Sequence, residues 1–279
     1  MVDDGSSDAS PDIVRKLADN YPDRIRLEHL EHSGPYPARN TGLDKARGDY
    51  IAFLDADDWW REDCLQNLYA GLQESGADLA YCGWQNVGDH ALGTEPYTPP
   101  AYEAGDTVEA FLRSCPWPIH AALVRRSVLE SVGGFSERYF SSMDYDLWLR
   151  ILAHTSAIVR VPEVMAYYRW HGSGQISATR WKQVMDAVQV RRDFVRDNPR
   201  MVKHLPKEAL DKLVDGQLLS AAYRTFWNRD LGNAQKLFRA AFTTRAWHVR
   251  DLKYLLPALL PARVFRGIVK MAGAAHDTV

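Results

Sequence analysis

The stretch YIAFLDADD, residues 50–58, places five apolar or aromatic residues directly before a cluster of three carboxylates. Its length and its aromatic and branched side chains predict a short buried strand that ends in an acidic turn. Side chains two positions apart on a strand point the same way, so Asp55 and Asp57 are expected to reach one point at the strand's carboxyl end. In open α/β sheets, ligands bind at that end.

Two carboxylates held together repel each other, so a bound cation is the natural third party. Oxygen ligands of this kind select magnesium, manganese or calcium rather than zinc. The alternative interpretation is a solvated acidic turn, in which Asp57 or Asp58 caps a helix that begins at Trp59.

The composition indicates a soluble globular protein with one large domain or two small ones. The 279 residues are 46% hydrophobic and 25% charged, and the net charge of −2 provides no basic field that would attract nucleic acid. The three cysteines are scattered without metal-ligand spacing, which suits a reducing cytosol. The start of the chain is neither basic nor apolar and no apolar run reaches about 18 residues, so neither a signal peptide nor a spanning helix is expected.

Arg39 lies in a helix predicted for residues 38–46, which Gly48 would end. A cation near the beginning of a helix works against the helix dipole, which favours anions there. Arg39 is therefore expected to face an anion such as a phosphate. A salt bridge to a neighbouring aspartate explains the position equally well.

Other segments follow from their apolar period and their turn residues. Helices are predicted from about Pro11 to Asp19, from Trp59 to Ser75 with Leu65, Leu68 and Leu72 on the buried face, and over residues 107–113. Strands are predicted at Val2–Asp3, Arg24–Glu28, Ala77–Trp84 and Val159–Arg169, and a loop with an internal boundary is predicted at Asp89–Glu103.

Two short helices are predicted on either side of a double glycine. Ser127 and Glu130 form the pattern of a capping box, and Gly133-Gly134 would end that helix. The second helix begins near Asp144, buries Trp148, Leu149 and Leu152, and pairs Asp146 with Arg150 four residues later. From about Arg180 onward the pattern is helical.

These motifs together resemble the inverting family-2 glycosyltransferases. The pieces are VDDGS at 2–6, ARNTG at 38–42, the acidic stretch at 50–58, GGF at 133–135 and DYDLWLR at 144–150, in the order of that family. Each piece is weak alone, but their order is specific, and the resemblance covers about residues 2–177.

The resemblance implies an α/β fold of the GT-A type, a Rossmann-like, mostly parallel sheet flanked by helices. The glycosyltransferase domain would span residues 1–180, with a nucleotide-binding half at 1–100 and an acceptor half at 101–180, and residues 181–279 would form a helical extension. Such an enzyme transfers a sugar, with inversion, from a nucleotide-diphosphate donor, here a UDP-sugar, to a hydroxyl of a saccharide or lipid-linked acceptor. Its setting would be the synthesis of cell-surface polysaccharide or glycolipid.

The resemblance also assigns roles to individual residues. Asp3 and Asp4 would contact the base and ribose, and Arg39 would lie by the nucleotide. Asp57, assisted by Asp55, would hold Mn²⁺ or Mg²⁺ on the diphosphate, which gains negative charge as it leaves. Asp144 would be the base that deprotonates the acceptor hydroxyl. The weaker candidates are His171 as a metal or phosphate ligand, Trp117 as a sugar-stacking platform with core packing as its alternative, and Gly134 and Phe135 on the acceptor side.

The chain departs from the family pattern in two places. Met143 stands where the family usually has glutamate directly before the base. Family members also begin with a strand and a helix ahead of the position of Val2, so the sequence is expected to have a mis-set start or to be a fragment.

Two rival functions and one open question about the tail remain. One rival is a phosphohydrolase with an aspartate nucleophile; that class prefers a small hydroxyl or branched residue where this chain has Trp59, which argues against it. The other rival is a degenerate, non-catalytic scaffold.

Residues 245–270 interleave apolar and basic side chains. This tail would either lie on an anionic membrane or pack back on the catalytic domain. The protein is expected in the cytoplasm in both cases, and at the inner membrane surface in the first.

Overall fold

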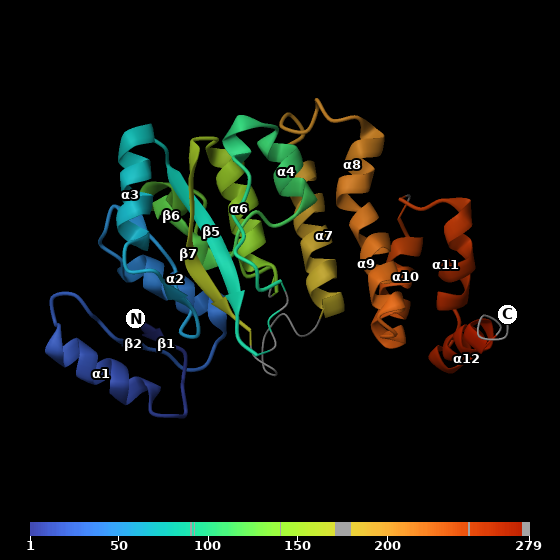
Figure 1. Cartoon of the computed structure of the whole chain (residues 1–279), viewed down its shortest axis with the longest axis horizontal. Coiled ribbons are helices and arrows are strands. Elements are labelled where there is room, and N and C mark those ends of the chain that lie inside the picture. Colours follow the sequence, from blue (N-terminus) through green and yellow to red (C-terminus); the bar gives the residue numbers. More distant parts are fainter. Residues whose placement is uncertain (90, 92, 140, 171–179, 245, 275–279) are drawn as a thin grey trace. The chain divides into compact units, whose positions relative to one another are not determined.

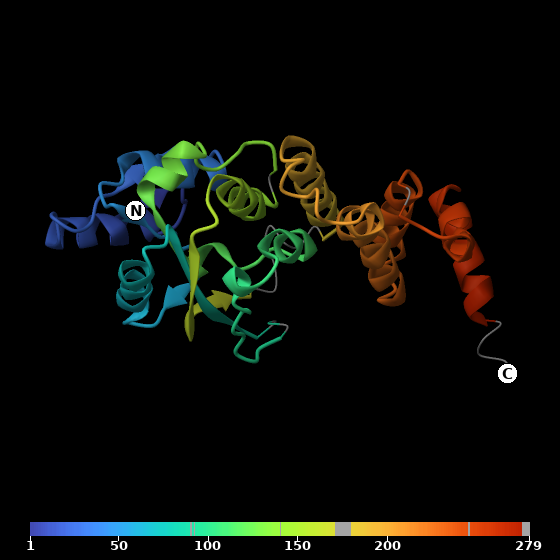
Figure 2. The same cartoon turned by 90° about the horizontal axis from the view of Figure 1, so that it is seen from above.

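The computed structural model describes residues 1–89, 91, 93–139, 141–170, 180–244 and 246–274 (Figures 1 and 2). The chain divides into two compact units. Unit 1 comprises Met1–Thr107 and Cys115–Gly172, and unit 2 comprises Val108–Ser114 and Ser173–Val279. Helix α4 (Thr107–Arg113) therefore belongs almost entirely to unit 2, although it interrupts the sequence of unit 1.

Unit 1 is an α/β structure in which seven described strands alternate with helices. The strands are β1 (Val2–Asp3), β2 (Glu28–His29), β3 (Tyr50–Ile51), β4 (Trp59–Trp60), β5 (Leu79–Val87), β6 (Ala122–Arg125) and β7 (Ile158–Arg169). The α-helices are α1 (Ser10–Asn20), α2 (Pro35–Lys45), α3 (Cys64–Ser75), α5 (Arg126–Ser131) and α6 (Met143–His154), with short 3-10 helices η1 (Tyr102–Ala104) and η2 (Ile119–Ala121).

The sheet of unit 1 is mixed rather than mostly parallel. Its five strands lie in the order β3-β6-β5-β7-β4, and only β5 and β7 pair in parallel. Strands β1 and β2 form a separate parallel pair. The α/β class predicted from the sequence is confirmed, while the parallel character is corrected, because the β3–β6, β5–β6 and β4–β7 pairs are antiparallel.

The acidic stretch forms less regular structure than its composition predicts. Strand β3 comprises only Tyr50–Ile51, which pair with Arg125 and Val124 of β6, and Leu54 is 44% exposed. The predicted helix start at Trp59 is also wrong, since Trp59–Trp60 forms strand β4 on the edge of β7. Helix α3 begins at Cys64; Leu68 and Leu72 are buried as predicted, but Leu65 is exposed.

Three further differences concern helix and strand ends. Helix α2 begins at Pro35, where proline suits the first turn. Residues 24–27, predicted as a strand, lie outside β2, and Arg24 N donates to Tyr21 O in a turn. The predicted capping box is not formed: α5 already begins at Arg126 and has no side-chain cap, although the double glycine ends it, with φ of +63° at Gly134.

Helix α6 matches its prediction closely. Trp148 and Leu149 are each 1% exposed, and Leu152 is also buried. Arg150 Nε donates to Asp146 Oδ2 at 2.8 Å, which is the predicted pair one helical turn apart. Burial of this face fixes the orientation of α6 in unit 1. The orientation of the residues in its first turn is fixed with it.

Unit 2 is helical, as expected from about Arg180 onward. It contains α7 (Arg180–Asp197), α8 (Lys207–Val214), α9 (Gly216–Trp227), α10 (Leu231–Phe242), η4 (Val249–Asp251), α11 (Leu252–Ala258) and α12 (Ala262–Ala274). Helices α9 and α10 lie side by side (Figure 1). Much of the apolar tail packs inward: Leu255 and Phe265 are buried, and Trp247 and Tyr254 pack against the same core. No helix among the described residues has the length and apolar character needed to cross a bilayer.

Candidate active site

The three carboxylates at the end of the acidic stretch lie in a turn and differ in their exposure. Asp58 N donates to Asp55 O at 3.1 Å, which closes the turn. Asp55 is half-buried, Asp57 is exposed and Asp58 is buried. The turn, rather than the alternation of a strand, therefore determines where Asp55 and Asp57 point.

Arg39 is an immediate neighbour of this turn. Its Nη2 atom donates to both carboxylate oxygens of Asp55 at 2.7 Å, and its Nη1 atom lies 3.2 Å from Met143 Sδ. The side chain is only 16% exposed. Its Nε atom is buried without a hydrogen-bond partner among the described residues. The structure thus contains the salt bridge that was the alternative to an anion contact, and it leaves one donor unused.

Asp144, at the beginning of α6, shares this electrostatic environment. Burial raises the pKa of its carboxyl above the ordinary value, while the positive charge of Arg39 opposes that shift and the negative charge of Asp55 adds to it. Its Oδ1 atom accepts a hydrogen bond from Tyr145 N at 2.9 Å. Residues far apart in the chain are therefore brought together.

Tyr168, near the end of β7, belongs to the same group and was not predicted. Burial, followed by the negative charges of Asp58, Asp144, Asp55 and Asp57, raises its pKa to about 12. The phenol stays protonated at neutral pH and can donate a hydrogen bond. The sequence placed Tyr168 at the carboxyl end of a predicted strand, where ligands bind. It offered no feature that would favour Tyr168 over its neighbour Tyr167 as a site residue.

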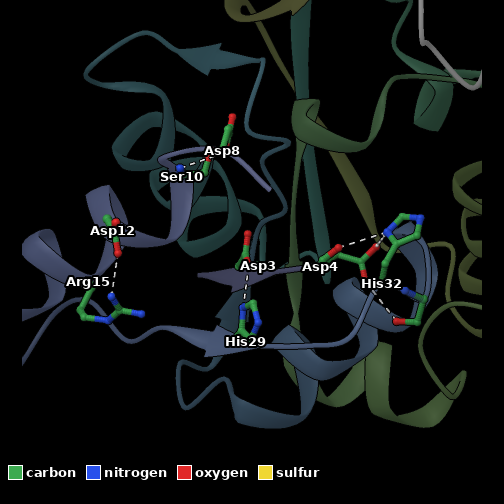
Figure 3. A network of polar contacts seen from close by, with 9 residues as sticks. Asp3, Asp4, Asp8, Ser10, Asp12, Arg15, His29 and His32 are labelled. Carbon is green, nitrogen blue, oxygen red and sulfur yellow. Dashed lines mark hydrogen bonds and ion pairs between the residues drawn. The ribbon is translucent and has the colours of Figure 1, made fainter. Parts of the chain in front are cut away.

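Asp3 and Asp4 are held by their own surroundings (Figure 3). Asp3 Oδ2 lies 2.6 Å from His29 Nδ1, and Asp4 accepts hydrogen bonds from Ser33 N at 2.8 Å and Gly34 N at 2.9 Å. Hydrogen bonds from Ser6 and His29 lower the pKa of Asp3. Burial acts to raise the pKa of Asp4, but the hydrogen bonds from Ser33 and Gly34 outweigh it. Both carboxylates are thus acceptors that favour their charged form, and their contact with a nucleotide stays a prediction.

The acceptor-side candidates are buried in this structure. Trp117 is 1% exposed and stacks on Tyr81 at a centroid distance of 4.2 Å, so core packing, not sugar stacking, describes it here. Phe135 is 2% exposed and lies under Arg39. Asn40 ties it to α2 by two hydrogen bonds, and a Cβ at Gly134 would lie 2.7 Å from Asn40 Oδ1. Gly134 and Phe135 therefore help to place Arg39, and His171 lies outside the described residues.

The carboxylates of Asp55 and Asp57 have the donor chemistry of a magnesium or manganese site. No group of three or more histidine, cysteine, aspartate or glutamate residues suited to a metal occurs in the described part of the chain. Such cations are commonly held by one or two carboxylates plus substrate phosphates. The residues present thus fit a cation whose coordination a bound diphosphate completes.

Sequence comparison connects these residues to known proteins. Residues 1–133 match the family described as Glycosyl transferase family 2. The chain is 29% identical, over 66% of its length and 70% of the relative's, to the Escherichia coli UDP-Glc:alpha-D-GlcNAc-diphosphoundecaprenol beta-1,3-glucosyltransferase WfaP. It is 26% identical to the Bacillus subtilis putative teichuronic acid biosynthesis glycosyltransferase TuaG, over 70% of this chain and 76% of TuaG. Other matches are partial: it spans 24% of the putative glycosyltransferase EpsH of Bacillus subtilis at 42% identity over 30% of this chain.

Solved structures share the fold. Staphylococcus aureus TarS 1-349 in complex with UDP-GlcNAc aligns with a TM-score of 0.60 and 16% identity, over 86% of this chain and 71% of that one. The mannosyltransferase PcManGT from Pyrobaculum calidifontis, in complex with GDP-Man and Mn²⁺, aligns with a TM-score of 0.55 and 22% identity, over 97% and 73%.

The fold is of the GT-A type. Residues 1–133 carry the match to glycosyl transferase family 2, and the relatives named above are glycosyltransferases, so the sequence comparison supports a family-2 glycosyltransferase.

Proposed function

We propose that the chain transfers a sugar from a UDP-sugar to a hydroxyl group with inversion, using Mn²⁺ or Mg²⁺. The observation that carries the proposal is the grouping of the Asp55–Asp58 turn, Arg39 and the raised-pKa carboxyl of Asp144 in unit 1. The names of two relatives support the setting, because one uses UDP-Glc on a diphosphoundecaprenol-linked sugar and the other serves teichuronic acid synthesis. A saccharide or lipid-linked acceptor in cell-surface glycan synthesis follows by analogy.

In this proposal, Asp57 and Asp55 hold the cation, which neutralises the charge of the leaving diphosphate. Arg39 exchanges part of its contact with Asp55 for a phosphate oxygen, and its unused Nε donor makes that exchange favourable. Asp144 accepts the proton of the acceptor hydroxyl. A raised pKa suits this task, since a base works best when its pKa approaches the working pH.

The remaining side chains shape the site. Tyr168 supplies a protonated phenol that can donate to a substrate oxygen. Asp3 and Asp4 lie on the β1 side and would accept hydrogen bonds from the base and ribose. The test is calorimetric titration with UDP, with and without Mn²⁺, followed by UDP release from UDP-sugars. A protein that binds no UDP would favour the scaffold alternative.

We also propose that unit 2 contacts an anionic membrane through the corner between α11 and α12. Four apolar side chains are exposed there: Leu256 at 50%, Leu259 at 45%, Leu260 at 40% and Val264 at 48%. An exposed apolar group of this kind usually marks a contact surface.

The corner is fixed rather than loose. Arg239 donates to Ala258 O at 2.6 Å and to Leu260 O at 2.7 Å, and Gln235 donates to the same two carbonyls. Four hydrogen bonds from α10 therefore hold the turn that presents Leu259 and Leu260 outward. The exposure of these leucines is a property of the fold.

The charges around the corner favour anionic lipid as its partner. Exposed basic side chains accompany the apolar ones: Arg250, Lys253, Arg263, Arg266 and Lys270. Asp251, the only acid in the sequence of residues 245–270, is buried and accepts hydrogen bonds from Tyr223 Oη and His248 N. Each basic residue near an anionic surface adds about 1 kcal/mol of attraction. An enzyme with a lipid-linked acceptor would be kept near its substrate.

A further inference from the structure

Asp58, the third carboxylate of the acidic turn, forms a buried pair with His120 of η2. Both side chains have 0% exposure, and His120 Nδ1 lies 3.1 Å from Asp58 Oδ2. The other oxygen, Oδ1, accepts a hydrogen bond from Arg169 N at 2.8 Å. Asp58 is thus anchored at the end of β7, while its neighbour Asp57 is exposed.

His120 is fixed from the other side. Its backbone oxygen accepts a hydrogen bond from Trp60 Nε1 at 2.7 Å, and its ring stacks on Tyr168 at a centroid distance of 5.7 Å and an angle of 12°. Its Nε2 atom has no hydrogen-bond partner among the described residues. The acidic turn, η2 and the end of β7 therefore meet at one buried point directly beside the candidate active site.

Stability does not explain why two polar side chains are buried here. Removing a carboxylate and an imidazole from water is costly, and apolar residues of similar volume often serve a core as well or better. The contact between Nδ1 and Oδ2 is close, but it is not well aligned as a hydrogen bond. What the pair does determine is geometry, because Asp58 N also closes the turn on Asp55 O.

We propose that Asp58 and His120 are positioning residues that hold the turn of residues 55–58 in the shape that binds the cation and the donor diphosphate. This inference rests on the proposed function. Neither side chain reaches the donor, since both are fully buried. Replacing a residue that holds a metal ligand in place without touching the metal commonly changes the metal affinity by roughly 10–100-fold.

The experiment replaces the pair and measures binding separately from stability. His120→Phe and the double variant Asp58→Leu/His120→Phe keep volume but remove the polar contact. His120→Asn keeps an N–H donor near the place of Nδ1. For each variant, UDP is titrated calorimetrically with Mn²⁺ and with EDTA, and the Tm is measured.

We expect the Mn²⁺-dependent affinity for UDP to fall at least roughly 10-fold in both apolar variants and to recover in His120→Asn. Binding of UDP in EDTA should not change, and the Tm of the double variant should stay level or rise. Should the apolar variants not fold, Trp60→Phe, which removes the bond to His120 O together with part of the indole ring but leaves Asp58 and His120 in place, is expected to cause a smaller loss in the same direction.

The matched control is Asp78→Ala, which removes another carboxylate of unit 1 that accepts hydrogen bonds from Arg125 and Thr155. Equal loss of Mn²⁺–UDP affinity in this control, or wild-type affinity in the pair variants, overturns the inference.

Asp57→Asn separates the positioning role of Asp58 and His120 from the proposed metal site. If it loses Mn²⁺–UDP binding while the pair variants keep it, only the positioning role fails; if it too binds normally, the proposed metal site fails as well.

Discussion

The Nη2 atom of Arg39 lies 2.7 Å from both carboxylate oxygens of Asp55. A guanidinium thus neutralises one of the two carboxylates that are proposed to hold a divalent cation. Donor binding must therefore weaken this ion pair or include it. In either case Arg39 and the cation share Asp55, so a change in one affects the affinity for the other.

Arg39→Ala should have opposite effects on two measurements. Without the guanidinium, Asp55 is free for metal, so Mn²⁺ should bind the nucleotide-free protein more tightly. Affinity for UDP in the presence of Mn²⁺ should fall by about 10-fold, or ~1.4 kcal/mol, because a phosphate contact is lost. Calorimetry measures both. Arg125→Ala, which removes a comparable cation from Asp78, serves as the control. If the affinity for Mn²⁺ and the affinity for UDP both rise or both fall, Arg39 and the cation do not share Asp55.

Asp57→Asn should remove Mn²⁺-dependent binding of UDP, because an amide brings no negative charge to the cation. Binding measured in EDTA should be unaffected. The same calorimetric titration checks this. Asp58 is the wrong residue for a control, since it is part of the proposed support; Asp49, which is exposed, gives the matched variant Asp49→Asn. Unchanged affinity in Asp57→Asn would place the metal elsewhere.

Asp144→Asn should preserve donor binding and slow transfer, because only the proton acceptor is lost. The rate should fall by roughly 10²–10⁴-fold, as is usual for loss of a general base. Comparing UDP affinity with UDP release in a single preparation checks this. Near wild-type turnover would mean that another group takes the proton.

The same substitution should stabilise the fold in a pH-dependent way. Burial raises the pKa of Asp144, so folding favours its protonated form, and stability is lost as pH rises from the ordinary value of 3.8 through the raised folded-state pKa. Asp144→Asn should therefore have a higher Tm than wild type at neutral pH, with the gain shrinking as the pH approaches the ordinary value. Thermal unfolding at a series of pH values measures this. A lower Tm at neutral pH would mean that the carboxylate is favoured by its surroundings.

Local sequence patterns predicted the parts of the fold that depend on local periodicity. Helix α6, with Trp148 buried and Asp146 paired with Arg150, follows directly from its 3.6-residue period. The acidic stretch was predicted less well, because β3 forms by pairing with β6, a strand far away in the sequence. Apolar composition alone cannot supply that information.

The residues of the candidate site also divide into those that the local sequence identifies and those that only distant contacts identify. Arg39, Asp55, Asp57 and Asp144 stand out by charge and motif, and the structure brings Arg39, Asp55 and Asp144 into one electrostatic environment. His120 could not be identified from its surroundings in the sequence, since its importance comes from Asp58, a residue in another element. For Trp117 the sequence left sugar stacking and core packing open, and the 1% exposure of the side chain in the structure corresponds to core packing.

Membrane contact through the α11–α12 corner makes a separate prediction. The protein should float with anionic liposomes at low salt and much less with neutral ones. Leu259→Glu/Leu260→Glu and Arg263→Glu/Arg266→Glu should each reduce flotation, while Lys212→Glu on α8 should not. Recovery of wild-type protein in the soluble fraction with anionic liposomes would contradict the proposal.

The most direct test of the account follows the anomer released when the protein hydrolyses UDP-α-glucose or UDP-α-GlcNAc, observed by proton NMR before mutarotation. Inverting transfer with water as the acceptor predicts that the β-sugar appears first, only with Mn²⁺ or Mg²⁺, and that Asp144→Asn suppresses its formation. Initial release of the α-sugar, or release that requires neither the cation nor Asp144, would contradict the proposed mechanism.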